Sequence, residues 1–180
     1  ISEGLFSGSP HSKLVPEWLR RIGYLVLLCL LLANVFWELI SVQQTFKPFG
    51  VIMGIESKHA YLSRQLPTLY PITHYANKNL PTEAKILYIG ETRGYYSDRL
   101  FIANTAHDAT PIVELTHQAN DVNDLLEKLK TLGVTHIIFN KREGTRLDTQ
   151  YNYLHWETPE DEAKFWEFYR KHLKLLHTMN

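Results

Sequence analysis

The stretch IGYLVLLCLLLANVFWELISV (residues 22–42) decides how the rest of the chain is interpreted. No charged residue occurs in it before Glu38. The hydrocarbon core of a bilayer, about 30 Å thick, is crossed by about 20 mostly apolar helical residues. We therefore predict a transmembrane helix at residues 22–42. The alternative is a buried helix of a soluble domain, which is common when the apolar run is shorter.

The residues that flank this run predict its orientation. Trp18, Arg20 and Arg21 precede it, and Phe36 and Trp37 lie near its far end. Aromatic side chains favour the bilayer interface, and Lys and Arg favour the cytoplasmic side. We predict a cytoplasmic loop or tail at residues 1–21 and an extracytoplasmic, periplasmic location for everything after residue 42.

The composition excludes some classes of protein. The 180 residues carry 19 Lys and Arg against 19 Asp and Glu, a formal net charge of zero. A nucleic-acid-binding protein needs a basic face, so nucleic acid is not an expected partner. The single cysteine, Cys29, allows no intrachain disulfide.

The rest of the chain alternates helical and strand patterns. A membrane-proximal helical segment is expected at residues 43–81, with helices at 56–66 and 70–79. Strands are predicted at 85–90, 100–103, 112–115 and 134–140, and helices at 120–132 and 158–176. A helix followed by Gly133 and an apolar strand is the return half of a βαβ unit. Residues 82–180 are therefore predicted to form a small three-layer α/β domain with a partly parallel sheet.

The polar segment after the first strand, residues 90–99, is the main candidate for a ligand site. Open α/β sheets bind ligands beyond the carboxyl ends of their strands. Guanidinium groups hold phosphates or carboxylates, and tyrosines stack on sugars. The candidate ligand-binding residues are Glu91, Arg93, Tyr95, Tyr96, Asp98 and Arg99. The alternative is a salt-bridged turn in which Glu91 pairs with Arg93 or Arg99.

The sequence shows no catalytic residue, metal site or cofactor motif. His107, His117 and His136 lack the spacing of metal ligands. The glycines of residues 90–99 match neither a phosphate-binding loop nor a dinucleotide-binding fingerprint. Lys141, Arg142 and Arg146 are expected to form a solvated basic turn or to face anionic headgroups.

The order of segments resembles the C-terminal region of a family of membrane proteins. The matching residues are Tyr61-Leu62, Asn79-Leu80-Pro81, Gly90-Glu91, Arg93-Gly94-Tyr95-Tyr96, Asp98-Arg99 and Leu132-Gly133-Val134-Thr135-His136. The family is the bacterial multi-span glycosyltransferases of the GT-C type, in the clan of the protein mannosyltransferases and the aminoarabinose transferases. The resemblance covers most of the chain after residue 42.

This resemblance implies a function in the bacterial inner membrane. Such enzymes move a sugar from a polyprenyl-phosphate carrier to an acceptor outside the membrane. Their acidic catalytic residue lies in the first outer loop, so no catalytic residue of this chain is implied. The chain would be the terminal span plus a periplasmic accessory domain, with the lipid bilayer, the polyprenyl-phosphate-linked sugar, its acceptor and other transmembrane helices as partners.

Two other classes remain open on the sequence alone. One is a single-span, membrane-anchored module that binds a ligand or partner without catalysis. The other is a soluble enzyme whose apolar run is part of its core. The transferase and the single-span module differ in what precedes Ile1: a transferase needs many spans there and a single-span module needs none. A start at a residue other than Met favours a fragment of a longer transferase.

Overall fold

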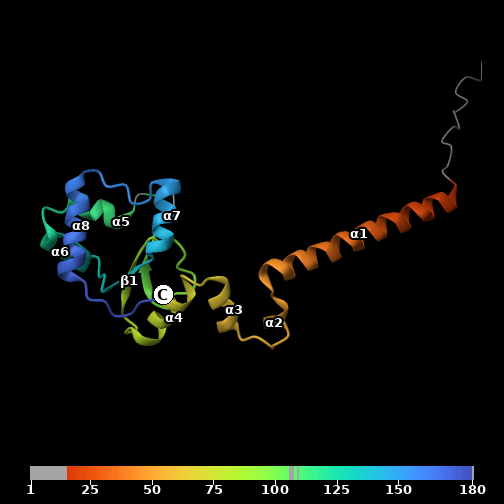
Figure 1. Cartoon of the computed structure of the whole chain (residues 1–180), viewed down its shortest axis with the longest axis horizontal. Helices are drawn as coiled ribbons and strands as arrows, with labels where there is room; N and C mark the ends of the chain where they lie inside the picture. The colour runs from red at the N-terminus through yellow and green to blue at the C-terminus, as the bar shows by residue number, and fades with distance from the viewer. Residues whose placement is uncertain (1–15, 106–107, 109, 180) are drawn as a thin grey trace, which may run out of the picture. The chain divides into compact units, whose positions relative to one another are not determined.

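The structure is a computed structural model that describes residues 16–105, 108 and 110–179 (Figure 1). The chain divides into two compact units, Ile1–Glu56 and Ser57–Asn180. His107, one of the histidines weighed above, lies outside the described residues.

The first unit contains α1 (Glu17–Phe46) and the short α2 (Phe49–Ile52). No residue of α1 is buried, and its length and composition make it a candidate membrane span. The helix extends beyond the predicted 22–42 at both ends. At its start Arg21 Nη2 lies 2.9 Å from Glu17 Oε1, a pair one turn apart that supports helix formation. At its end Lys47 takes a left-handed conformation with φ 49°.

The second unit is built on a three-stranded sheet in the order β2-β1-β3. The strands β1 (Lys85–Ile89), β2 (Leu100–Ile102) and β3 (His136–Phe139) confirm three of the four predicted strands. Both pairings are parallel, so the described sheet is wholly parallel rather than partly so. Residues 86–89 are all buried, as expected for a central parallel strand with both faces covered.

Alternate residues of β1 belong to two different apolar clusters. Ile86 and Tyr88 pack with residues beside and within α4 (Tyr70–Asn79). Leu87 and Ile89 pack with residues of α5 (Pro111–Gln118), α6 (Val122–Thr131) and α8 (Pro159–His172). The helices predicted at 70–79 and 120–132 are confirmed, and the last helix ends at His172 instead of residue 176. α3 (Lys58–Gln65) confirms the helix expected at 56–66.

The strand predicted at residues 112–115 is wrong, because these residues lie in α5. Pro111 occupies the first turn, where a proline favours helix. Ile112, Val113 and Thr116 are all buried, and their spacing places them on one helical face. The hydroxyl of Thr116 donates to the carbonyl of Ile112 at 2.6 Å, one turn earlier. The short apolar pattern was ambiguous, and burial against α6 and α8 decides it.

A charged cluster joins the end of α5 to the start of α8. Asp161 is buried, and its Oδ2 lies 2.8 Å from His117 Nδ1. His117 Nε2 lies 3.1 Å from Glu157 Oε2. Lys164 donates to the other oxygen of Asp161 at 3.2 Å. Hydrogen bonding to Asp161, with the charge of Glu157 as a further cause, raises the pKa of His117.

We expect the thermal unfolding midpoint of the chain to fall as the pH rises from about 6 to about 8.5, and to fall less in His117→Gln. The pKa of His117 is raised above its ordinary 6.5, so its stabilisation is complete below pH 6.5 and is lost as the pH rises through the folded pKa. The hydrogen bond from His117 lowers the pKa of Asp161. The stabilisation that the Asp161 carboxylate contributes is therefore lost only when the pH falls. Equal slopes in the two proteins would contradict this account.

Candidate functional site

The carboxyl end of β1 is held directly against the start of α7 (Lys141–Tyr151). Gly90 has φ +69°, and a Cβ there would lie 2.4 Å from the carbonyl oxygen of Asn140 and 2.8 Å from Cα of Gly144. Only glycine permits this approach. The backbone N–H of Asn140 donates to Ile89 O at 2.9 Å, and its side chain caps α7 by accepting from the N–H of Glu143. The side chains after β1 and those of the first turns of α7 therefore meet.

Glu91 is a buried carboxylate whose hydrogen bonds connect the segment after β1 to the residue before α7. Only 1% of its side chain is exposed. Its Oε1 accepts from Arg93 Nε at 2.7 Å and its Oε2 from Arg93 Nη2 at 2.9 Å. The side-chain amide of Asn140 donates to Oε2 at 3.1 Å, and the backbone N–H groups of Thr92 and Arg93 donate to Oε1. This bidentate pairing fixes the orientation of the Arg93 guanidinium.

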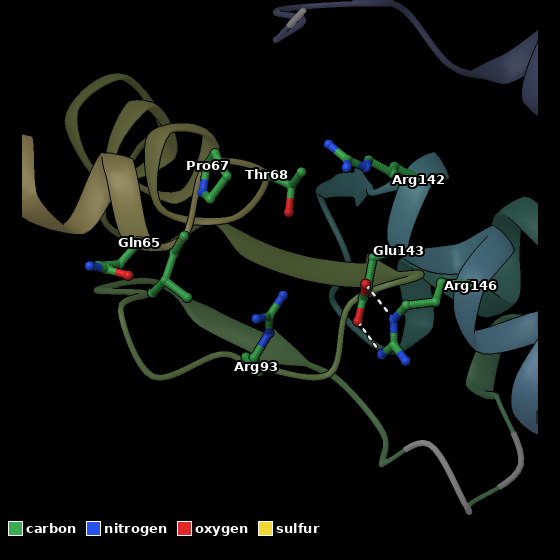
Figure 2. A pocket seen from close by; sticks show the side chains of 8 residues that line it. Gln65, Pro67, Thr68, Arg93, Arg142, Glu143 and Arg146 are labelled. Atoms are coloured by element: carbon green, nitrogen blue, oxygen red, sulfur yellow. Dashed lines mark hydrogen bonds and ion pairs between the residues drawn. The ribbon is translucent and has the colours of Figure 1, made fainter. Parts of the chain in front are cut away.

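A pocket of about 430 Å³ lies beside this ion pair (Figure 2). The segment after α3 forms one wall and α7 forms another. Its lining residues are Gln65, Leu66, Pro67, Thr68, Arg93, Arg142, Glu143 and Arg146. In Figure 2 the side chains of Arg93 and Arg142 extend toward the open space from different segments, and Arg146 is joined to Glu143. Three guanidinium groups thus surround one cavity.

The charges of the pocket do not cancel. Arg146 Nη2 lies 2.6 Å from Glu143 Oε1 and its Nε lies 2.9 Å from Oε2. This hydrogen bonding lowers the pKa of Glu143 and raises the pKa of Arg146. The hydrogen bond to Glu91 likewise raises the pKa of Arg93. Arg142 has no ion-pair partner among the described residues. Three cations therefore face two carboxylates, Glu143 in the lining and Glu91 behind it.

This arrangement suits an anion more than any other ligand. Guanidinium groups present planar, paired N–H donors that match phosphate and carboxylate oxygens. Arg142 keeps all of its donors available, and Arg93 and Arg146 are half exposed, with 47% and 48% of their side chains accessible. In the described residues no group of His, Cys, Asp or Glu is arranged to hold a metal ion. The pocket offers charge and hydrogen bonds, and it presents no nucleophile and base in contact.

The structure separates the six residues that the sequence placed in one candidate site. Glu91 and Arg93 lie at the pocket. Arg99 lies near the end of α4, where its Nη2 donates to the carbonyls of Asn77 at 2.7 Å and Leu80 at 2.9 Å. These hydrogen bonds attach the loop between β1 and β2 to the end of α4. The loop contains no helix. The Arg99 guanidinium therefore contacts backbone carbonyls and does not line the pocket. The salt-bridged turn considered as an alternative describes the Glu91–Arg93 pair.

The remaining three candidates lie along the same loop. Asp98 is exposed, and its backbone N–H donates to the side chain of Asn77 at 2.9 Å. The Tyr96 ring contacts the rings of Tyr70 and Tyr95 edge to face at 5.4 and 5.1 Å. Tyr95 is 88% exposed. None of these three residues lines the pocket.

The sequence analysis did not join the residues of α7 to those after β1. Arg142 and Arg146 were expected in a basic turn that is either solvated or faces anionic headgroups, and Asn140 and Glu143 were not considered. The signal was present, because strands at 85–90 and 134–140 in a parallel sheet end at the same edge. Residues 90–93 and 140–143 were therefore predictable neighbours. The register confirms this, since Ile89 pairs with Phe139.

The fold and pocket define a class: a small parallel α/β domain with a basic pocket at its carboxyl edge, in a chain that also carries a candidate membrane span. Comparisons do not extend this description, because no family model, curated protein or solved structure matches the chain significantly. The geometry of the pocket is therefore the basis for inferring what the domain binds.

Proposed function

We propose that the domain binds the phosphate group of a membrane-borne ligand in the pocket lined by Arg93, Arg142 and Arg146, and that α1 anchors it to the bilayer. The observation that carries this proposal is the convergence of three guanidinium groups from two segments on one cavity. Charge-assisted hydrogen bonds from arginine are the strongest that a side chain offers to a phosphate. A phosphate also carries more charge than a carboxylate, which suits three cations.

The fold supports this location for a ligand. We include in the proposal the three-layer arrangement, with α4 on one face of the sheet and α5, α6 and α8 on the other. The division of β1 residues between two apolar clusters supports it. Parallel sheets with helices on both faces bind ligands beyond the carboxyl ends of their strands. Gly90, Glu91 and Asn140 lie at that edge.

The wider role that we propose follows the resemblance to GT-C glycosyltransferases. In that setting the chain is the terminal span and periplasmic accessory domain of a bacterial inner-membrane enzyme. The phosphate would belong to a polyprenyl-phosphate-linked sugar, and catalysis would reside elsewhere in the protein. The positive charges before residue 22 and the apolar length of α1 support this orientation. A membrane-anchored binding module without catalysis would use the same pocket.

The test is phosphate binding by the full chain in detergent micelles, with inorganic pyrophosphate and inorganic phosphate as probes in titration calorimetry. We expect pyrophosphate to bind, and Arg142→Ala and Arg146→Ala each to weaken binding by about tenfold or more, since a hydrogen bond to a charged group contributes about 1.5–3 kcal/mol. Inorganic phosphate should bind more weakly because it carries less charge.

Arg170→Ala is the matched control. Arg170 is an exposed arginine in the last turn of α8 and does not line the pocket. This variant loses the same charge, so it reports the effect of net charge alone. We expect it to bind pyrophosphate within about twofold of the wild type. Equal weakening in all three variants, or no binding by the wild type at millimolar concentration, would refute the proposal.

A further inference from the structure

The carboxylate of Glu143 occupies the paired N–H donors of Arg146. Arg146 Nη2 donates to Glu143 Oε1 at 2.6 Å, and its Nε donates to Oε2 at 2.9 Å. These are the two parallel donors with which a guanidinium binds a phosphate or a carboxylate. In Figure 2 the Glu143 carboxylate lies between the guanidinium groups of Arg146 and Arg93. An anion that enters the pocket therefore meets a carboxylate that already holds the donors it needs.

The two guanidinium groups beside Glu143 have anchors of their own. Arg93 is held by the bidentate pairing with Glu91, at 2.7 and 2.9 Å. Arg146 Nη1 donates to Oε1 of Gln150, one turn further along α7. Each guanidinium therefore keeps one partner when the Glu143 carboxylate moves away. Positioning of the arginines is not the main contribution that Glu143 makes to the pocket.

The start of α7 does not depend on the Glu143 carboxylate either. Asn140 and Glu143 have the spacing of a capping box, in which the third helical residue accepts from the backbone N–H of the N-cap residue. That N–H of Asn140 instead donates to the carbonyl of Ile89 at 2.9 Å. The remaining half of the cap uses only the backbone N–H of Glu143, which donates to the Asn140 side chain. The carboxylate can therefore be displaced without loss of the cap.

We propose that Glu143 is an internal competitor of the ligand, whose carboxylate holds Arg146 in the empty pocket and is displaced when a phosphate group binds. The inference rests on the phosphate site proposed above and describes how that site is regulated. The hydrogen bonds from Arg146 lower the pKa of Glu143, so the competitor is ionised at neutral pH. It is also tethered one turn from its partner, which gives it a high effective concentration.

An internal competitor sets a threshold for the ligand. A single carboxylate offers Arg146 nothing that Glu143 does not already supply, so it has no means to displace the tethered group. A phosphate carries more charge and three oxygens, and it can contact Arg93, Arg142 and Arg146 together. These added contacts offset the loss of the Glu143 pair. The pocket is thereby reserved for phosphate groups, and carboxylate anions are kept out.

Calorimetric titration of the full chain in detergent micelles with inorganic pyrophosphate tests the proposal. We expect Glu143→Gln to bind pyrophosphate about tenfold more tightly than the wild type or better, because the paired donors of Arg146 become available for charge-assisted hydrogen bonds. A residue that served to position Arg146 would have the opposite effect on substitution. Binding by Glu143→Gln that is unchanged or weaker would therefore overturn the proposal.

Two controls separate competition from the effect of charge. Glu143→Asp keeps the charge but is one methylene shorter, so it reaches the two donors less well, and we expect about threefold tighter binding. Glu127→Gln removes a carboxylate from a pair of the same spacing with Lys130, outside the pocket, and should bind within about twofold of the wild type. Tighter binding by Glu143→Gln with unchanged binding by Glu143→Asp would show an effect of charge alone and would overturn the competitor.

The outcomes also distinguish the competitor from the phosphate site itself. No binding by the wild type and by Glu143→Gln at millimolar pyrophosphate would refute the site and the competitor with it. Binding by the wild type without a gain in Glu143→Gln would overturn the competitor and leave the site standing. Acetate is the second probe, and we expect it to bind Glu143→Gln more tightly than the wild type. Equal binding of acetate by the two proteins would contradict the threshold.

Discussion

Gly90→Ala is expected to lower the free energy of unfolding of the α/β domain by about 3 kcal/mol or more. Two costs add. Gly90 has φ +69°, where an L-residue with a Cβ is strained. The new Cβ would also lie 2.4 Å from the Asn140 carbonyl oxygen and 2.8 Å from Gly144 Cα, and backbone atoms cannot move aside as a flexible side chain can. Urea unfolding of the full chain, followed by circular dichroism, measures the loss.

Comparison with Gly133→Ala separates the steric cost of the new Cβ from the conformational cost. Gly133 also has a positive φ, +76°, but a Cβ there would meet only Cδ of Lys85 at 3.7 Å, an ordinary van der Waals contact. We expect this variant to lose only the conformational cost of about 1–2 kcal/mol. The difference between the two variants then measures the close approach of β1 to α7. Equal losses would mean that α7 moves away without cost and that the geometry of the pocket is not fixed by Gly90.

Glu91→Leu is expected to cost the domain about 3 kcal/mol, because it leaves the guanidinium of Arg93 and the amide of Asn140 without their acceptor. The full penalty of breaking a buried ion pair is larger, but Arg93 is 47% exposed, so water replaces part of what it loses. The two backbone N–H groups that Glu91 accepts from also lose their partner. Urea unfolding measures this change as well.

Glu127→Leu is the control for Glu91→Leu. Glu127 pairs with Lys130 at 2.9 Å, but 67% of its side chain is exposed. Exposed pairs of this kind contribute little, so we expect a change within about 0.5 kcal/mol. A similar effect of the two substitutions would show that the contacts of Glu91 are as weak as a surface pair. Glu91 would then not hold Arg93 in a fixed position beside the pocket.

The sequence predicted most of the helices and strands that have a clear apolar periodicity or a capping residue. The central strand at Lys85 and the capped helices at Asp121 and Thr158 have clear starts and periodicity, and the apolar run at 22–42 indicates a helix that extends in the structure from Glu17 to Phe46. Asp121 accepts from the N–H groups of Asn123 and Asp124, and Thr158 from that of Asp161, as their positions before apolar helices suggested. Local chemistry decides these boundaries, so they can be read without tertiary information.

The predictions are wrong or incomplete where tertiary contacts decide the conformation or the position of a segment. Residues 112–115 are apolar enough for a strand, and their burial against α6 and α8 favours the helix that Pro111 begins. α7 has few apolar residues, and its position depends on the backbone contact between Gly90 and Gly144. The candidate ligand site was predicted after β1 as one continuous segment, whereas the pocket combines two segments. Its arginines come from two segments about 50 residues apart, Arg93 on one and Arg142 and Arg146 on the other, because the parallel sheet brings the ends of β1 and β3 together.

The parallel pairing of β1 with both neighbours also sets an order of events during synthesis. β2 follows β1 closely, whereas β3 comes only after α5 and α6 have been made. In a chain that is synthesised N-terminus first, β1 and β2 are complete long before residues 136–139 exist. Until then the second edge of β1 has no hydrogen-bond partner and its apolar side chains lack part of their cover. This interval is when the nascent domain is most exposed to aggregation and most dependent on chaperones.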